Sequence, residues 1–262
     1  MKSGIHGLFI CGTIGEGPLL GIDQREAVAE NAVDFVNGRV PIIIHTGTER
    51  LDKTSELTLH AEDIGADAVG IVVPYYYNYS QKELFEYYKE IARKTEIPIF
   101  IYNIPSRTGN NINVSTIKRL NTEFSQIIGL KDSSKDIIFL SEVLSNLPKS
   151  FIILIGSDAL IFPGLLLGCK GAISTISNAF PELLIELYNK IEERDLTMAK
   201  EIQFKILQAR NILSMHSYIA VYKAILRLKG IPIQNIVMEP LHKISSEEAN
   251  RLFEALKRIG LI

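Results

Sequence analysis

The chain has 262 residues, of which 47% are hydrophobic, enough for one large α/β domain or one barrel with an appendage. Its formal net charge of −2 offers no basic surface for nucleic acid or an anionic membrane. Cys11 and Cys169 lie far apart beside apolar residues, as buried free thiols do in a reducing compartment. With no membrane-spanning run and no signal-peptide core at the start, we expect a cytoplasmic protein without nucleic-acid or membrane partners.

Short apolar segments alternate with amphipathic ones along most of the chain. The expected strands are residues 8–11, 40–45, 68–73, 97–102, 127–131, 151–155 and 172–176. The expected helices between them are residues 24–36, 53–64, 82–94, 114–120, 136–147 and 159–167. Capping-box spacing marks two helix starts, at Asp23 and at Ser80. This alternation predicts parallel βαβ units, hence a doubly wound sheet or a (β/α)8 TIM barrel.

After Pro181 the strand pattern stops and only helices are expected. They cover residues 183–193, 198–213, 218–229 and 247–258. The first of them is expected to close the barrel, and the others to form a C-terminal helical lobe. The predicted domains are therefore a (β/α) barrel over residues 1–195 and a lobe over residues 196–262.

The number of expected strands is one short of a complete barrel. Only residues 1–6 precede the first expected strand. A (β/α)8 barrel of about 250 residues uses roughly 30 for each βα unit. The chain is therefore expected to lack the first βα unit, unless its start has been mis-assigned.

Lys131 ends a short apolar strand and is followed at once by Asp132 and two serines. Burial at such a place disfavours the charged ammonium and lowers the pKa of the lysine. A neutral amine is what Schiff-base chemistry on a keto acid requires. The alternative is a lysine that extends to solvent at the strand end or pairs with Asp132.

Other strand ends are also rich in polar groups. Glycines in residues 12–18 would let the backbone approach a ligand, although a tight turn explains them as well and no phosphate-loop Gly-Lys-Ser/Thr follows. Tyrosines at residues 75–77 could serve packing alone. Residues 102–109 bring a phenol, an amide, a hydroxyl and a guanidinium into one loop. Because Tyr102 and Lys131 end successive parallel strands, the phenol is expected beside the amine.

Five of these segments together resemble a known family. They are Gly-Thr-x-Gly-Glu at 12–16, Pro-Tyr-Tyr at 74–76, Tyr-Asn-x-Pro-Ser-Arg-Thr-Gly at 102–109, Gly-x-Lys at 129–131 and Gly-Ser-Asp at 156–158. Their order and spacing are similar to those of the dihydrodipicolinate synthase / N-acetylneuraminate lyase family of class I pyruvate-dependent aldolases. The resemblance implies a (β/α)8 barrel with a C-terminal helical lobe, usually assembled as a homotetramer (a dimer of dimers).

The resemblance also implies four catalytic residues. Lys131 matches the lysine that forms a covalent imine with pyruvate, and Tyr102 matches the general acid/base. Thr13 matches the hydroxyl that relays protons. Tyr76 matches a second relay tyrosine, which in the family enters the site from a neighbouring subunit.

Substrate-binding positions follow from the same resemblance. Gly156 and Ile173 match positions that line the pyruvate pocket through their backbone, and Arg107 matches an arginine that binds the second substrate's carboxylate. Ile14 stands where the family commonly has a threonine that helps to hold the pyruvate carboxylate. Here the carboxylate would rely on backbone N–H groups up to Gly15, and a lost hydrogen bond to a charged group costs about 1.5–3 kcal/mol.

No cofactor or metal is expected. An imine already makes the keto carbon an electron sink, so the neighbouring methyl group can lose a proton near neutral pH. The five histidines show no metal-ligand spacing and are expected at the surface or satisfied in the core: His6, His45, His60, His216 and His242. His45 is the one histidine that ends an expected strand, which is where site residues are expected.

Three functions are compatible with these residues. The first is the synthase of lysine biosynthesis, which joins pyruvate to aspartate 4-semialdehyde and is favoured by Arg107. The second is a 2-keto-3-deoxygluconate-type aldolase that uses pyruvate and glyceraldehyde, favoured by Ile14 and by Gly17 with Pro18. The third is a non-catalytic barrel that acts as a binding protein, which the retained catalytic set opposes.

Overall fold

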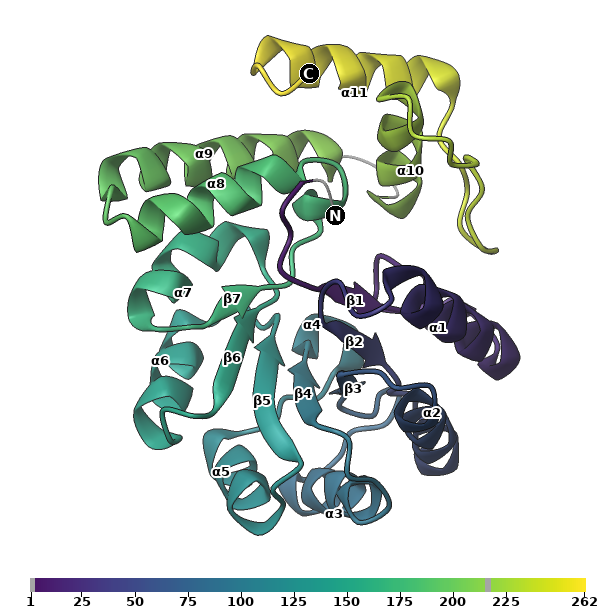
Figure 1. Ribbon diagram of the computed structural model, residues 1–262, viewed down its shortest axis with the longest axis vertical. Coiled ribbons are helices and arrows are strands. Elements are labelled where there is room, and N and C mark those ends of the chain that lie inside the picture. Colours follow the sequence, from purple (N-terminus) through teal and green to yellow (C-terminus); the bar gives the residue numbers. More distant parts are fainter. Residues whose placement is uncertain (1–2, 215–217) are drawn as a thin grey trace.

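The computed structural model describes residues 3–214 and 218–262. Its centre is one sheet of seven parallel strands in sequential order, curled as Figure 1 shows. The strands are β1 (Leu8–Ile10), β2 (Ile42–His45), β3 (Ala68–Val72), β4 (Ile99–Asn103), β5 (Ile127–Asp132), β6 (Ile152–Ile155) and β7 (Gly171–Ala172). The predicted parallel α/β architecture is confirmed.

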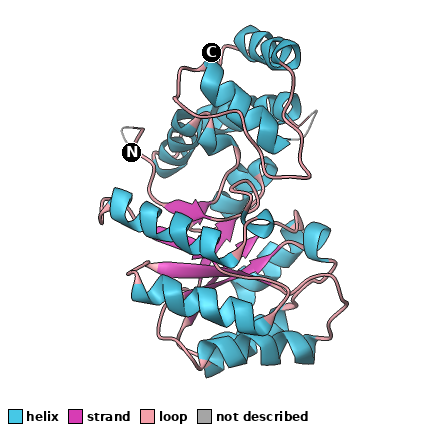
Figure 2. Ribbon diagram, turned by 90° about the vertical axis from the view of Figure 1, so that its right-hand side faces the viewer, coloured by secondary structure: helices cyan, strands magenta, loops and turns pink. Residues whose placement is uncertain are grey.

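Helices cover the outer face of the curled sheet (Figures 1 and 2). They are α1 (Ile22–Val36), α2 (Leu51–Asp63), α3 (Gln81–Ala92), α5 (Val114–Glu123), α6 (Ile137–Asn146) and α7 (Ile161–Leu167), with a short α4 (Pro105–Thr108) after β4. Four further helices gather at one end of the molecule: α8 (Pro181–Glu192), α9 (Leu196–Leu213), α10 (Tyr218–Leu228) and α11 (Ser246–Arg258). No described helix is long and apolar enough to cross a membrane.

Two hydrophobic clusters support this arrangement. The larger lies between the strands and their covering helices, where Val69, Ile71 and Ile101 are completely buried. Such β-branched runs are typical of parallel strands that are buried on both faces. The second cluster joins the C-terminal helices, with Leu187 and Ile206 at its centre, so α8 packs with α9.

Both edges of the sheet remain open. Within residues 3–214 and 218–262, β1 pairs only with β2 and β7 only with β6. Strand β7 is shorter than predicted and ends at Ala172. Beyond it, Ser174 accepts a hydrogen bond from the backbone N–H of Ser177 at 3.1 Å, and a 3-10 helix (Ile176–Asn178) follows. This local bond offers the backbone an alternative to the strand ladder.

Local hydrogen bonds fix the helix starts. The predicted capping box at Ser80 is confirmed, with Glu83 accepting from its backbone N–H at 2.7 Å. The one predicted at Asp23 is wrong, because α1 begins two residues earlier than expected and the N–H of its cap residue Gly21 donates to the Gln24 side chain at 2.9 Å. Asp23 instead lies in the first turn, where its charge complements the helix dipole.

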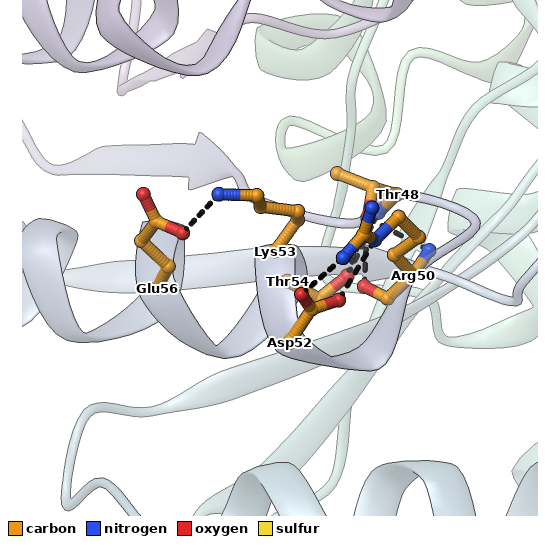
Figure 3. A network of polar contacts seen from close by, with 6 residues as sticks. All are labelled: Thr48, Arg50, Asp52, Lys53, Thr54 and Glu56. Atoms are coloured by element: carbon orange, nitrogen blue, oxygen red, sulfur yellow. Dashed lines mark hydrogen bonds and ion pairs between the residues drawn. The ribbon is translucent and has the colours of Figure 1, made fainter.

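The start of α2 is held by a network of short-range polar contacts (Figure 3). Thr54 accepts a hydrogen bond from the backbone N–H of Thr48 at 2.9 Å, and both side chains are buried in this turn. Arg50 and Asp52 form an exposed ion pair at 2.6 Å. The turn after β2 is thereby joined to the helix that follows it.

Candidate active site

A cavity of about 1030 Å³ opens at the carboxyl ends of the strands. Its wall includes Thr13, Tyr102, Lys131 and Gly156, which come from the ends of four different strands. This is the end at which parallel α/β barrels keep their chemistry. The same cavity extends toward the open edges of β1 and β7.

Lys131 points into this cavity and is only 5% exposed. The β4–β5 register sets it directly opposite Tyr102, and its Nζ lies 3.7 Å from the centre of the Tyr102 ring. The Phe9 ring lies 3.8 Å away from the same Nζ. Asp132 instead accepts a hydrogen bond from Asn103 at 2.9 Å. The alternative of a lysine that reaches solvent or pairs with Asp132 is therefore wrong.

The surroundings of Lys131 favour the neutral amine. Burial lowers its pKa to about 7, because the aromatic rings desolvate the ammonium. An ordinary lysine has a pKa of about 10.4. A large fraction of the amine is therefore unprotonated at neutral pH and can act as a nucleophile.

Tyr102 supplies a protonated phenol at the same place. Its hydroxyl lies 3.2 Å from the Thr13 hydroxyl, in hydrogen-bond contact. Burial raises the pKa of Tyr102, while the hydroxyls of Thr13 and Ser133 oppose this shift. A phenol that stays protonated and has hydroxyl partners can pass protons to and from a bound carbonyl compound.

Phe9 and Ser133 are two site residues that the sequence did not single out. Phe9 projects from β1 beneath Lys131, and a Cβ on Gly70 would lie 2.7 Å from its ring. That glycine therefore makes the room in which the ring packs. Ser133 follows Lys131 by two residues, so its place at a strand end was the available signal.

The glycine-rich turn after β1 presents Thr13 to Tyr102. Gly17 is required here, because a Cβ would lie 1.8 Å from the Cys11 carbonyl oxygen. Ile14 lines the cavity and packs against the C-terminal hydrophobic cluster. Gly15 belongs to the same turn but is not one of the described residues that line the cavity. Its predicted contact with substrate stays a prediction.

Gly156 and Ile173 lie at the opposite side of the cavity. A Cβ on Gly156 would lie 2.0 Å from the Ser133 Oγ, so only glycine permits this close approach of β6 to β5. The backbone N–H of Ile173 donates to the Ile155 carbonyl at 2.8 Å. Both predicted residues thus line the cavity, and their contact with pyruvate through the backbone stays a prediction.

Arg107 lies at the mouth of the cavity, on α4. Its side chain is exposed, and Nη2 donates to the Tyr218 hydroxyl at 3.3 Å. The guanidinium also lies 5.7 Å from the centre of that ring. This position leaves the cation free to meet a ligand that enters the cavity.

Tyr76 is not brought together with the other predicted catalytic residues. It is 85% exposed, has a φ of 80°, and its ring packs edge-on against Tyr77 with the centres 5.0 Å apart. It does not line the cavity within this single chain. Its predicted role, which needs a second subunit, stays a prediction.

Comparison with known proteins agrees with this geometry. The sequence model of the Dihydrodipicolinate synthetase family matches residues 1–259. The chain belongs to this family. Two similar relatives are named 4-hydroxy-tetrahydrodipicolinate synthase: one from Methanopyrus kandleri (35% identical, 100% of this chain and 87% of the relative) and one from Aquifex aeolicus (36%, 100% and 88%).

Solved structures of this family have the same fold. YagE of E. coli K12, a prophage protein of the dihydrodipicolinic acid synthase family in complex with pyruvate, gives a TM-score of 0.95 at 31% identity. The match covers 100% of this chain and 89% of YagE. Dihydrodipicolinate synthase from Aquifex aeolicus gives 0.94 at 35% identity, over 99% and 88% of the two chains.

The histidines of this family member have separate surroundings. His45 is buried 5.7 Å from the Tyr102 ring, and burial together with nearby Arg25 holds its pKa well below the ordinary value. His60 bonds Glu30 at 3.0 Å. His216 lies outside the described residues. Within the described part of the chain, no three His, Cys, Asp or Glu residues are grouped to hold a metal ion.

Proposed function

We propose that the chain is a 4-hydroxy-tetrahydrodipicolinate synthase, a class I carbon–carbon lyase of lysine biosynthesis that condenses pyruvate with aspartate 4-semialdehyde in the cytoplasm. The observation that carries this proposal is the buried Lys131 amine, with a pKa of about 7, beside a phenol that contacts the Thr13 hydroxyl. The names of the relatives support the choice of substrates.

The first half of the reaction forms the covalent imine without a cofactor. Neutral Nζ of Lys131 attacks the keto carbon of pyruvate, and the two amine protons leave on the carbonyl oxygen as water. Tyr102 carries them, with Thr13 as its hydrogen-bond partner. Protonation of the imine then allows the methyl group to lose a proton, which gives the nucleophilic enamine.

The second half joins the enamine to the aldehyde. The enamine carbon attacks the aldehyde carbon, and Tyr102 gives the new alkoxide its proton. Arg107 at the cavity mouth binds the semialdehyde carboxylate in a bidentate pair. Backbone of the turn at residues 13–15, with Gly156 and Ile173, holds the pyruvate end. The amino group of the condensed semialdehyde then attacks the imine carbon, and the Lys131 amine leaves as the ring closes, which releases the cyclic product and restores Lys131.

The finer architecture is part of the same proposal. The sheet is a TIM barrel that lacks one βα unit, with the barrel in residues 1–195 and a helical lobe in residues 196–262. Two open sheet edges beside one cavity support this, as does the chain's coverage of 85–90% of its similar relatives. Four chains assemble as a dimer of dimers, and exposed Tyr76 completes the relay in a neighbouring subunit.

A 2-keto-3-deoxygluconate-type aldolase is the second candidate. It is favoured by Ile14, which gives the pyruvate end no hydroxyl and packs on apolar helices. The test is a panel in which the purified chain receives pyruvate with either aspartate 4-semialdehyde or glyceraldehyde. We expect faster pyruvate consumption and product formation with the semialdehyde. A preference for glyceraldehyde would select the aldolase, and binding without turnover of either would select the non-catalytic alternative.

A further inference from the structure

A partly buried ion pair joins the Thr13 turn to the C-terminal helices. Glu16 follows this turn and is only 8% exposed. One of its carboxylate oxygens accepts from Lys223 Nζ at 2.6 Å, and the other accepts from the backbone N–H of Met238 at 3.1 Å. Lys223, on α10, also donates to the Ile236 carbonyl at 2.6 Å. One carboxylate thus connects the turn to two segments more than 200 residues away in the sequence.

Two of the backbone hydrogen bonds that close the turn are long. The N–H of Glu16 reaches the Thr13 carbonyl at 3.3 Å, and that of Gly17 reaches Gly12 at 3.2 Å. Cys11 and Glu16 also have φ values of 55° and 58°, in the left-handed region that residues with a Cβ rarely occupy. Surrounding structure must hold a backbone of this kind in place.

Helix α10 touches both sides of the active site. Lys223 meets the turn that carries Thr13, and Tyr218 meets Arg107 at the cavity mouth. The two contacts come from the same helix. The helix is therefore placed to set the position of groups on which both substrates depend.

We propose that Lys223 is a positioning residue: through Glu16 it holds the turn so that the Thr13 hydroxyl meets Tyr102 and the turn's N–H groups meet the pyruvate carboxylate. The inference rests on the proposed function. A displacement of about 1 Å in reacting groups can cost about 100-fold in rate. Loss of Lys223 also leaves the buried Glu16 carboxylate without its counter-charge, which favours such a displacement.

The test compares Lys223→Met with Lys229→Met. The two lysine side chains are 23% and 25% exposed, and Lys229 contacts Ala179 and Glu182 rather than the turn. For each folded variant, borohydride trapping measures imine formation with pyruvate alone. We expect Lys223→Met to lower the second-order rate constant for trapping, measured at low pyruvate concentration, by about 10- to 100-fold. Most of this loss is expected to come from weaker pyruvate binding. Lys229→Met is expected within about twofold of wild type.

Two further variants separate positioning from stability. Lys223→Arg keeps the charge and is expected to recover most of the trapping rate. Glu16→Gln retains an acceptor for Met238 but loses the charge, so it carries the test if Lys223→Met does not fold. Trapping that is unchanged in both Lys223→Met and Glu16→Gln, or equally reduced in Lys229→Met, would overturn the inference alone. Absence of a pyruvate adduct in wild type would overturn the proposed function as well.

Discussion

Two lysines, Lys131 which is buried and Lys223 which is partly buried, show opposite ways of placing an amine inside one protein. Lys131 lies against the Phe9 and Tyr102 rings and has no carboxylate partner in the described structure. Lys223 lies 2.6 Å from the Glu16 carboxylate. The first environment lowers the pKa of the amine, and the second gives the ammonium a counter-charge. The comparison shows that burial without a carboxylate partner lowers the pKa of a lysine, whereas a carboxylate at hydrogen-bond distance gives the ammonium a counter-charge.

The substitution Lys131→Met is expected to have the largest effect, because it removes the buried amine altogether. We expect turnover to fall by at least about 10⁴-fold, because the covalent intermediate cannot form. The same change is expected to raise the free energy of unfolding by about 2–5 kcal/mol at pH 7. The reason is that the Lys131 amine is protonated in the unfolded chain and becomes harder to protonate when folding buries it, a cost that methionine does not have. Enzyme assay and urea denaturation measure the two effects. Lys170→Met, at an exposed lysine of the cavity wall, is the control and should change neither.

Tyr102→Phe tests the phenol without changing the ring that covers Lys131. The ring still desolvates the amine, so the adduct with pyruvate should form, but slowly. Loss of a general acid/base typically costs about 10²- to 10⁴-fold. Stopped-flow measurement of imine formation and of condensation checks this. A variant as fast as wild type would remove Tyr102 from the relay.

Arg107→Ala separates the two substrates. A guanidinium that grips the semialdehyde carboxylate contributes about 2–4 kcal/mol, so kcat/KM for this aldehyde should fall about 30- to 1,000-fold. Pyruvate trapping and the reaction with glyceraldehyde should change little. Equal losses with both aldehydes would mean that Arg107 braces the mouth through Tyr218 instead.

The pH dependence of imine formation sharpens the contrast between the two lysines. Because burial lowers the pKa of Lys131 to about 7, the rate should rise about tenfold per pH unit below pH 7 and level off above it. The unfolded chain binds more protons at this lysine between pH 7 and 10.5, so the contribution of Lys131 to stability rises with pH across that window. A rate that keeps rising to pH 10 would indicate an ordinary lysine amine.

The sequence alone predicted the reacting residues of the site better than the residues that surround and support them. Tyr102 and Lys131 were expected side by side because adjacent parallel strands end at the same edge, and the register confirms it. The ring of Phe9 could not be expected, because the room for it comes from Gly70 on another strand. The Glu16–Lys223 contact joins residues 207 apart, a separation at which spacing in the sequence carries no signal.

Errors at the element ends have equally local causes. Residues 173–176 were expected to continue the last strand, yet the strand ends at Ala172 and the Ser174 side chain accepts a hydrogen bond from the backbone N–H of Ser177. Tyr76 illustrates a different limit: its predicted role depends on a second subunit, which neither one sequence nor one chain contains.

The central claim is that Lys131 forms an imine with pyruvate. The most direct measurement is borohydride reduction in the presence of pyruvate, followed by intact-mass analysis and peptide mapping. We predict one reduced pyruvate adduct per chain, located on Lys131, with loss of activity and no effect of EDTA. An adduct on another lysine, no adduct at all, or turnover abolished by EDTA would contradict the account.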